Sequence, residues 1–406
     1  CNASIYLQTK IYLNMKTSRI YSTRRALVAV GSLFTISIGI AFLALALFSW
    51  NPDYQWVSPA SSGPGFLYSR FNPNYDEIYF TPESDWDEAQ LLTVIEHSPN
   101  FSIVPAEGIV NNSIAFLVKP PGNMDTLPTG ELWLLDLKTG KRNLLASDPD
   151  IGVKPIWTRD GTHLMYRRVR QQVQELVELE LSTQTRTVYA VQRAYSRGLF
   201  PLGEGDLGSQ YYVEIFSTGV FVSKHSQSET EPEICFKISD TFARDFSISP
   251  DGQKMIYLQT VIQSERLFFQ TYLAEIDCRD QQPRALLGEN PTEQYSPIWS
   301  PIEQTITIGT KSIERQKSGI MFSNGDSFDF ISLPPDRTGF DVPVAWSHDE
   351  DYLLTKSFDG LSSANPGYGM IYVIDRETGM RYKAVSYTHL RAHETRHDLV
   401  CRLLLE

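Results

Sequence analysis

The sequence predicts an all-β protein, a β-propeller of six or seven blades. One pattern returns five times: an aromatic or apolar residue, then Ser, Thr or Asn, then a turn and an apolar strand. The copies begin at Phe71, Trp157, Ile248, Trp299 and Trp346. The intervals between them are 86, 91, 51 and 47 residues, so the two long intervals are each close to twice the short ones. A repeat of roughly 45 residues has the length of one propeller blade.

A second pattern completes the repeat, because an alternating strand ends in an aspartate at Asp136, Asp277 and Asp375. The last two aspartates lie 29 residues after the copies at 248 and 346. The same offset before Asp136 predicts a hidden copy at 107, with its strand at residues 114–116. A degenerate copy is expected near 203, around residues 211–213 and 219–222. The sequence therefore predicts seven units, five of them clear and two inferred.

The turns of the repeat have a simple physical role. Asp-Gly reverses the chain between strands, because Gly tolerates positive φ and Asp accepts hydrogen bonds within its own turn. We therefore expect Asp160, Asp251 and Asp349 to cap turns, and we assign no metal to them. The Trp of each copy is expected to begin the following strand and to be buried between blades, where a large ring fills a wedge-shaped gap.

These motifs resemble those of the TolB-like propellers, whose repeats contain Trp-Ser-Pro-Asp-Gly, an apolar strand and a later Asp-x-x-Thr-Gly turn. The best matches are Ile248–Gly252 and Trp157–Gly161, and the resemblance covers Phe66 to Ala384. The copy at Trp299 departs from the family pattern, since Ile302-Glu303 replaces Asp-Gly. The resemblance implies a WD-repeat-like propeller over residues 66–384 that serves as a binding platform.

The N-terminal part has the features of a membrane anchor. Residues 26–48 are 23 residues without a charge, the length of a helix that crosses a bilayer. Basic residues precede this stretch and no acidic residue occurs before Asp53, which predicts a cytoplasmic segment over residues 1–25 and an extracytoplasmic propeller. Met15 is the expected start, so residues 1–14 are not translated in nature. We expect an uncleaved anchor rather than a signal peptide, followed by a linker over residues 49–65.

The C-terminal residues 385–406 do not belong to the pattern. Residues 385–394 correspond codon by codon to a transposon end used in sequencing libraries, and residues 399–405 to the adapter that follows it. We interpret the segment as translated adapter, which belongs to no fold. The natural protein then departs from this sequence after Ala384, and we expect further chain there.

The region between the two ends is acidic. Residues 51–384 hold 28 Lys and Arg against 45 Asp and Glu, a net charge of −17. Such a surface disfavours nucleic acid, so we expect no nucleic-acid partner. Its two cysteines, Cys235 and Cys278, are 43 residues apart, at comparable points of neighbouring blades. An exported pair is able to form a disulfide, but we expect two unpaired thiols. No cofactor is expected.

Three functions fit a membrane-anchored propeller. The leading hypothesis is a platform that binds a protein or a polysaccharide at the cell envelope through variable loops at one mouth, with residues 120–130, 192–210 and 357–369 as the longest candidates. The first alternative is the propeller of a serine exopeptidase of the prolyl oligopeptidase type, whose hydrolase domain is missing here. The second is a propeller that acts on glycans through paired carboxylates.

No residue is assigned a catalytic, cofactor-binding or metal-binding role. Gly360–Ala364 is the nearest string to a Gly-x-Ser-x-Gly nucleophile motif, but it lacks the second Gly. The acidic runs Asp85–Glu88 and Asp349–Asp351 are interpreted as solvated loops. The histidines His97, His163, His225 and His348 are scattered, and we expect them to be isolated on the surface. The sequence thus makes an enzyme the less favoured reading.

Overall fold

The computed structural model describes the backbone of residues 65 to 385, apart from short gaps. The gaps fall at 84, 87–88, 107, 121–128, 151, 206–208, 227–231, 264–265, 280–281, 289–291, 313–317, 325–326, 335–337, 348 and 361–364. The predictions for residues 1–25, 26–48 and 386–406, and for the linker before Gly65, lie outside the described residues. The described part of the chain contains no helix, and hence none able to span a membrane.

The described residues form 27 strands in seven antiparallel sheets. The first three sheets contain β1 (Gly65–Asn72), β2 (Tyr75–Pro82) and β3 (Gln90–Glu96); β4 (Ser102–Pro105), β5 (Ser113–Lys119), β6 (Glu131–Asp136) and β7 (Arg142–Ala146); and β8 (Ile156–Trp157), β9 (His163–Arg170), β10 (Val173–Glu180) and β11 (Arg186–Val191). The fourth and fifth contain β12 (Ser196–Glu204), β13 (Gln210–Phe216), β14 (Gly219–His225) and β15 (Glu233–Ser239); and β16 (Ala243–Ile248), β17 (Lys254–Gln263), β18 (Arg266–Glu275) and β19 (Arg284–Ala285). The last two contain β20 (Thr292–Trp299), β21 (Ile306–Ser312), β22 (Ser318–Asn324) and β23 (Ser327–Ser332); and β24 (Phe340–Trp346), β25 (Tyr352–Phe358), β26 (Gly369–Asp375) and β27 (Arg381–Val385).

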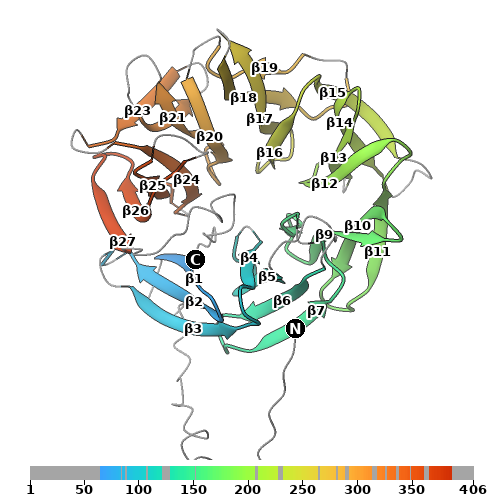
Figure 1. Ribbon diagram of the computed structural model, residues 1–406, viewed down its shortest axis with the longest axis horizontal. Coiled ribbons are helices and arrows are strands. Elements are labelled where there is room, and N and C mark those ends of the chain that lie inside the picture. The colour runs from blue at the N-terminus through green and yellow to red at the C-terminus, as the bar shows by residue number, and fades with distance from the viewer. Residues whose placement is uncertain are drawn as a thin grey trace, which may run out of the picture. The chain divides into compact units, whose positions relative to one another are not determined.

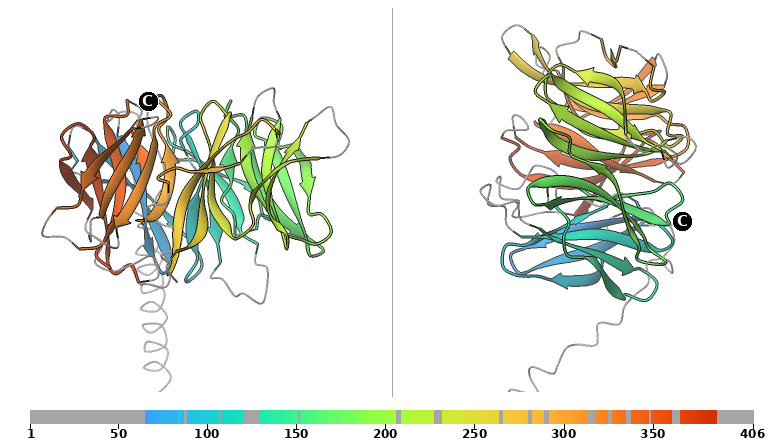
Figure 2. Two further views of the ribbon diagram at one scale, coloured as in Figure 1. Left: turned by 90° about the horizontal axis from the view of Figure 1, so that it is seen from above. Right: turned by 90° about the vertical axis from the view of Figure 1, so that its right-hand side faces the viewer.

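The seven sheets follow one another around a ring in chain order (Figure 1). In six of them the chain passes through four strands as a meander, with the first strand innermost. Figure 2 shows the ring edge-on, with the strands running between its two faces. This is a seven-bladed β-propeller, which decides between the six or seven blades expected. Both inferred copies are confirmed, since β5 contains residues 114–116 and β13 and β14 contain residues 211–213 and 219–222.

The repeated turn motif joins the first and second strands of a blade by one hydrogen-bond scheme. In four blades the hydroxyl of the motif Ser or Thr accepts the backbone N–H five residues later, at 2.8 to 3.0 Å: Thr158, Ser249, Ser300 and Ser347. In three of them the same hydroxyl donates to an aspartate two residues on: Asp160, Asp251 and Asp349. The prediction that these aspartates cap their own turns is confirmed, because each also accepts a backbone N–H within the turn.

The third turn of a blade uses Asp-x-x-Thr-Gly in the same way. The carboxylate of Asp136 accepts the N–H groups of Lys138 and Thr139, and Gly140 donates its N–H to the Asp136 carbonyl. Gly140 has a φ of 71°, a conformation that favours glycine. These two kinds of turn fix the register of the strands that they join.

Burial of the motif Trp between blades is confirmed for Trp346, whereas Trp157 and Trp299 are half-buried. Its place in the blade also differs from the prediction. Trp346 is the last residue of β24, and Trp299 is the last residue of β20. Each therefore ends the strand before the turn and does not begin the strand after it. Trp346 packs between the sixth and seventh blades, where its ring lies 5.4 Å from Phe322 and its indole N–H donates to the Thr307 hydroxyl at 3.0 Å.

The first blade is out of phase with the other six. Its β2–β3 turn lies beside the motif turn of the seventh blade, since the Trp86 ring is 5.0 Å from the Tyr352 ring. Burial and the nearby Asp349 and Asp351 carboxylates raise the pKa of Glu83, in the same turn. In a four-stranded blade only the first and third turns lie at that face. The three strands β1, β2 and β3 therefore correspond to the second, third and fourth strands of the other blades.

The motif copy at Phe71 therefore matches the repeat in sequence but not in its position in the blade. Asn72 and Tyr75 close the β1–β2 hairpin, which precedes an apolar strand as predicted. The hairpin lies at the opposite end of the blade from the other copies, because Asn74 and Pro73 accept N–H groups from His97 and Asn100, in the connection that leads to β4. The sequence pattern alone does not show at which face of the ring a turn lies, because any Asn-Pro turn between two apolar strands matches it.

The two cysteines form a disulfide, which corrects the expectation of unpaired thiols. Cys235 lies in β15 of the fourth blade, and Cys278 follows β18 of the fifth blade. Their expected place on neighbouring blades is correct, and so the covalent bond joins the two blades. The pairing was missed because a separation of 43 residues does not show that two side chains point toward each other.

Candidate ligand-binding face

The meander gives the ring two chemically different faces. Antiparallel strands reverse direction at every turn, so the first and third turns of a blade lie at one face. We call it the motif face, because the turns at Thr158, Ser249, Ser300 and Ser347 form it. The second turn of each blade and the connection to the next blade lie at the opposite face, which we call the connection face.

Carboxylates of the motif face are committed to holding turns and blades together. Hydrogen bonds from the hydroxyl and the N–H of Thr162 lower the pKa of Asp160 to about 2. The carboxylate of Glu204, at the end of β12, accepts the N–H of Arg159 in the preceding blade at 3.0 Å. These carboxylates hold together the turns and the neighbouring blades.

Glu350 corrects the interpretation of Asp349–Asp351 as a solvated loop. Its side chain is buried and accepts the N–H groups of Ile302 and Glu303 from the sixth blade. Arg376 bridges the Glu303 carboxylate at 3.1 Å and lies over the Trp346 ring at 5.4 Å. The neighbouring Asp349 and Asp351 are exposed as expected. In the other acidic run Asp85 is exposed, while residues 87–88 lie outside the described residues.

Exposed apolar side chains concentrate on the connection face. Within the described residues fifteen large apolar side chains are exposed, and eight of them lie at this face: Tyr75, Val173, Val191, Tyr195, Phe242, Ile262, Leu267 and Tyr368. Five lie on outermost strands: Leu144, Val188, Ile234, Phe328 and Phe330. The motif face has Ile302 and Met380.

Tyr195 is the most exposed of these side chains, at 91%, and its backbone φ of 69° lies in the left-handed region. A bulky residue in that region is strained, and such strain is often found at binding sites. The turn that holds it is rigid. The Gln192 side chain donates to the Ser196 carbonyl at 2.7 Å and accepts the Gln174 N–H at 3.0 Å, and Ser196 donates its N–H to the Arg193 carbonyl.

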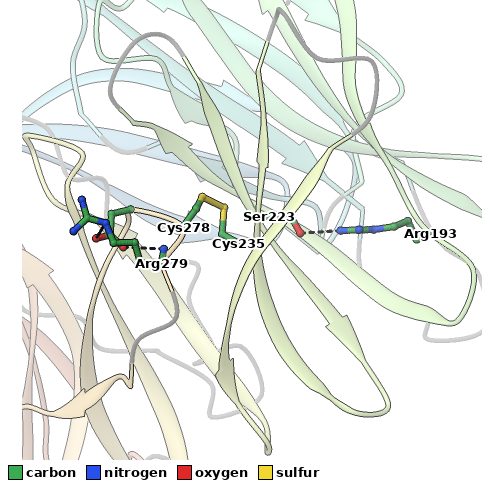
Figure 3. The surroundings of a disulfide bond; sticks show 6 residues. Arg193, Ser223, Cys235, Cys278 and Arg279 are labelled. Carbon is green, nitrogen blue, oxygen red and sulfur yellow. Dashed lines mark hydrogen bonds and ion pairs between the residues drawn. A yellow bond between two sulfur atoms is a disulfide. The ribbon is translucent and has the colours of Figure 1, made fainter.

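Arg193 anchors the same turn to the fourth blade. Its guanidinium donates to the fully buried Glu214 carboxylate at 2.7 Å and to the Ser223 hydroxyl at 2.8 Å. Figure 3 shows Arg193 reaching Ser223 across the sheet that carries the disulfide of Cys235 and Cys278. The exposed Tyr195 ring is thus presented on a turn held by the ion pair of Arg193 with the buried Glu214, which reduces the entropy lost when a ligand binds.

The fifth blade supplies the next part of the face. Its β17–β18 hairpin is built from two strands of ten residues and presents Ile262 and Leu267 near its tip. Phe242 lies in the connection at its base and accepts the Thr260 N–H through its carbonyl at 3.1 Å. Arg244 lies over the Phe269 ring at 4.1 Å, so a cation adjoins the apolar side chains.

The three loops predicted to carry ligand contacts are only partly loops. Residues 192–210 contain the whole of the innermost strand β12, with a connection at 192–195 before it and the β12–β13 turn after it. Residues 206–208 of that turn lie outside the described residues. Residues 120–130 and 357–369 join the second and third strands of their blades, but 121–128 and 361–364 lie outside the described residues. Each of the three segments has residues at the connection face, as expected for loops that surround one mouth of the ring. The string Gly360–Ala364 falls mainly in the second of these gaps.

Of the four predicted surface histidines, His97 has a buried side chain, while His163 and His225 are half-buried. His97 has a side chain only 1% exposed, with its Nε2 atom 3.7 Å from an Asp76 oxygen. The Nδ1 atom of His225 is buried and its ring lies 6.5 Å from Tyr189. His163 is partly exposed as expected, and His348 lies outside the described residues. Burial of His97 was missed because the β1–β2 hairpin that covers it is brought there by the fold.

Asp76 shares that buried site. Its carboxylate accepts the N–H of Ile103 at 2.7 Å and of Asn72 at 3.3 Å, which ties the first blade to the innermost strand of the second. Burial raises the pKa of Asp76 to about 6, against the opposing effects of the Ile103 N–H and of His97. The Asp76 carboxyl lies below the surface, so its hydrogen bonds link the two blades and do not form a ligand site.

Among the described residues one cluster has the makeup of a metal site, Glu233 with Cys235 and Cys278. The two sulfur atoms are bonded to each other, so neither is a free thiolate ligand.

Asp245 is an acidic residue of an innermost strand, with a φ of 55° at a bulge in β16. Its carboxylate lies 3.7 Å from Arg244, which makes it part of an ion pair.

No protein-family model matches the chain, and no curated protein matches its sequence. Solved structures do match. An oligogalacturonate lyase from Vibrio parahaemolyticus has a TM-score of 0.53 at 12% identity, over 81% of this chain and 87% of that chain. A prolyl endopeptidase structure has a TM-score of 0.55 at 13% identity, over 79% of this chain and 48% of that chain. TolB from Acinetobacter baumannii matches with a TM-score of 0.47 at 16% identity, over 69% and 65%. Likenesses at such low identity show the propeller fold alone.

Proposed function

We propose that the protein is a binding platform, a propeller that captures a protein or a polysaccharide at the cell envelope through its connection face. The observation that carries the proposal is the concentration of exposed apolar side chains there, with Tyr195 held on a rigid turn. The motif face offers no comparable surface in the described residues. Rigid aromatic side chains supply contact area at small entropic loss, as binding surfaces require.

The proposal includes a single-pass membrane anchor at residues 26–48, with the propeller outside the cytoplasm. The apolar length and the preceding basic residues support it. The disulfide of Cys235 and Cys278 supports it independently, because such bonds persist in oxidising compartments. Thiol counting on protein from the membrane fraction tests this part: we expect no free thiol at these two positions, and two free thiols would contradict export.

Binding is tested with the full chain from Met15 in detergent micelles. Immobilised polygalacturonate, peptidoglycan fragments and an unfolded casein serve as probes in surface plasmon resonance. We expect one of these classes to bind, with a loss of at least tenfold in the variant Tyr195→Ser/Phe242→Ser. The matched control is Ile302→Ser/Met380→Ser, which removes the two exposed apolar side chains of the motif face. An equal loss in both variants would contradict the proposed face.

The peptidase hypothesis keeps a specific support, since the matched prolyl endopeptidase is about twice as long as the part that this chain covers. In that case the propeller is the non-catalytic half of a membrane-anchored peptidase. The glycan hypothesis is supported by the lyase, most of whose chain is covered. A turnover assay on polygalacturonate separates it from binding alone, since only an enzyme releases unsaturated product.

We also propose that residues 385–406 are translated adapter. Strand β27 extends through the backbone of Val385, one residue past the expected boundary. A long-read sequence of the intact gene across Ala384 tests this proposal. A natural sequence that differs after this point supports it, and an identical sequence contradicts it. The same read decides whether a hydrolase domain follows.

A further inference from the structure

The connection face is basic at the boundary of the third and fourth blades, although the protein is acidic overall. This area consists of the tip of the β9–β10 hairpin, residues 168–175, and the segment that leads into β12 and contains Tyr195, residues 192–198. The two segments contain four arginines and one carboxylate, whereas residues 51–384 have a net charge of −17. We call the two segments the basic corner.

Hydrogen bonds hold the two segments of the basic corner against each other. Gln192 donates its N–H to the Gln174 carbonyl at 2.8 Å, and its side chain accepts the Gln174 N–H at 3.0 Å. The Gln174 side chain accepts the Leu199 N–H at 2.8 Å. Arg170 is directly opposite Val173 in the hairpin, next to Gln174. The hairpin tip therefore adjoins the turn that presents Tyr195.

Two of the four arginines have charge available for a ligand. Glu175, the single carboxylate of the basic corner, pairs with Arg168 at 2.7 Å. Arg193 pairs with a buried carboxylate of the fourth blade. Arg170 and Arg197 are exposed, and neither has an ion pair or a side-chain hydrogen bond within the part of the chain that the structure describes.

Three residues of the basic corner have a left-handed backbone. Gln171, Gln172 and Tyr195 have φ values of 50°, 67° and 69°, a region that bulky side chains seldom adopt. Residues in such conformations concentrate at binding and catalytic sites, where the surrounding structure supports the strain. Here the hydrogen bonds of Gln192 provide that support. The strain is a second indication, independent of charge, that this corner serves a function.

We propose that the basic corner binds an acidic segment of a partner protein, whose carboxylates pair with Arg170 and Arg197 while an apolar side chain packs on Tyr195. This inference rests on the proposed function, since it names the partner class of the connection face. Tyr and Arg are among the residues most enriched at the energetic centres of protein interfaces. The exposed Val173 and Val191 extend the apolar contact and favour a protein over a polysaccharide, whose hydroxyl groups require polar partners.

The acidic charge of the rest of the propeller adds selectivity. An anionic segment is repelled by most of the surface and attracted by the basic corner, so its binding is confined to one place. Salt screens charges beyond about 8 Å at physiological ionic strength. The complex should therefore weaken as the salt concentration rises.

The test compares two peptides of about twelve residues in surface plasmon resonance with the full chain in detergent micelles. One peptide consists of glutamate and tyrosine, and the other has glutamine in place of every glutamate, so only the charge differs. We expect the acidic peptide to bind at least tenfold more tightly, and this advantage to disappear in Arg170→Ser/Arg197→Ser. The matched control Arg142→Ser/Arg284→Ser removes two exposed arginines of outermost strands and should bind as wild type.

The outcomes distinguish this inference from the proposed function. Equal binding of the two peptides, or full binding of the acidic peptide by Arg170→Ser/Arg197→Ser, would overturn the inference. If Tyr195→Ser/Phe242→Ser still lost binding in that case, the connection face would remain the binding surface. Binding of polygalacturonate without binding of the acidic peptide would overturn the choice of a protein partner. Absence of binding to every probe would contradict both proposals. Because Arg170 and Arg197 are exposed, their variant should keep the wild-type thermal midpoint.

Discussion

The two faces of the ring are made from the same strands, yet they use their side chains differently. At the motif face Ser249, Asp160 and Glu350 bond to backbone groups of their own or the neighbouring blade. At the connection face Tyr195 extends into solvent from a turn held by other residues, and Ile262 does so near the end of β17. The difference indicates that one face was shaped by the demands of the fold and the other is free to meet a ligand.

The largest expected contrast is in stability. Trp346→Ala removes a buried ring between two blades and should lower the free energy of unfolding by about 3 to 5 kcal/mol. Phe242→Ala, at the connection face, should change it by less than about 0.5 kcal/mol because the ring is exposed. Urea unfolding followed by tryptophan fluorescence measures both. Equal losses would show that the connection face is structural too.

A contrast between carboxylates should come next. Glu350→Ala leaves the Ile302 and Glu303 N–H groups without their acceptor and should destabilise the protein by about 2 kcal/mol. Asp240, whose ion pair with Lys237 is exposed, serves as the control, and Asp240→Ala should cost about 0 to 1 kcal/mol. Thermal midpoints of both variants decide. An unchanged thermal midpoint in Glu350→Ala would mean that water replaces the two lost hydrogen bonds.

The contributions of Asp160 and Asp76 to stability should depend on pH in opposite directions. The pKa of Asp160 is lowered to about 2, so its contribution is present above pH 4 and is lost as the pH falls toward 2. The pKa of Asp76 is raised to about 6, so its contribution is present below pH 4 and is lost as the pH rises through 6. Unfolding free energies of Asp160→Asn and Asp76→Asn, compared with wild type from pH 2 to 7, should diverge in these opposite windows. Parallel pH profiles would refute the assignment.

The smallest effect concerns one hydroxyl. Ser249→Ala removes the acceptor of the Lys254 N–H and should cost about 1 kcal/mol, as loss of a turn cap does. Ser249→Thr keeps the hydroxyl, as Thr158 does in the third blade, and should recover most of this loss. Denaturation midpoints of the two variants suffice. A loss in Ser249→Thr as large as in Ser249→Ala would locate the effect in packing.

The repeat predicted the architecture because its turn chemistry is local. The hydroxyl and carboxylate of Ser249 and Asp251 act within six residues, so the sequence alone is sufficient to place the turn. Burial of His97 and Glu350 depends on hairpins from other parts of the ring, which no local pattern encodes. The disulfide also depends on distance across blades. The connection face was predicted only as loops. Tyr195 was missed because it lies in a turn between blades and not in the repeated motif.

The central claim is that the connection face binds a ligand while the motif face holds the ring together. The most direct measurement compares Tyr195→Ser/Phe242→Ser with Ile302→Ser/Met380→Ser, each replacing two exposed apolar side chains. The account predicts at least a tenfold loss of binding to the captured probe in the first variant, wild-type binding in the second, and wild-type thermal midpoints in both. Full binding by the first variant, or loss by the second, would contradict it.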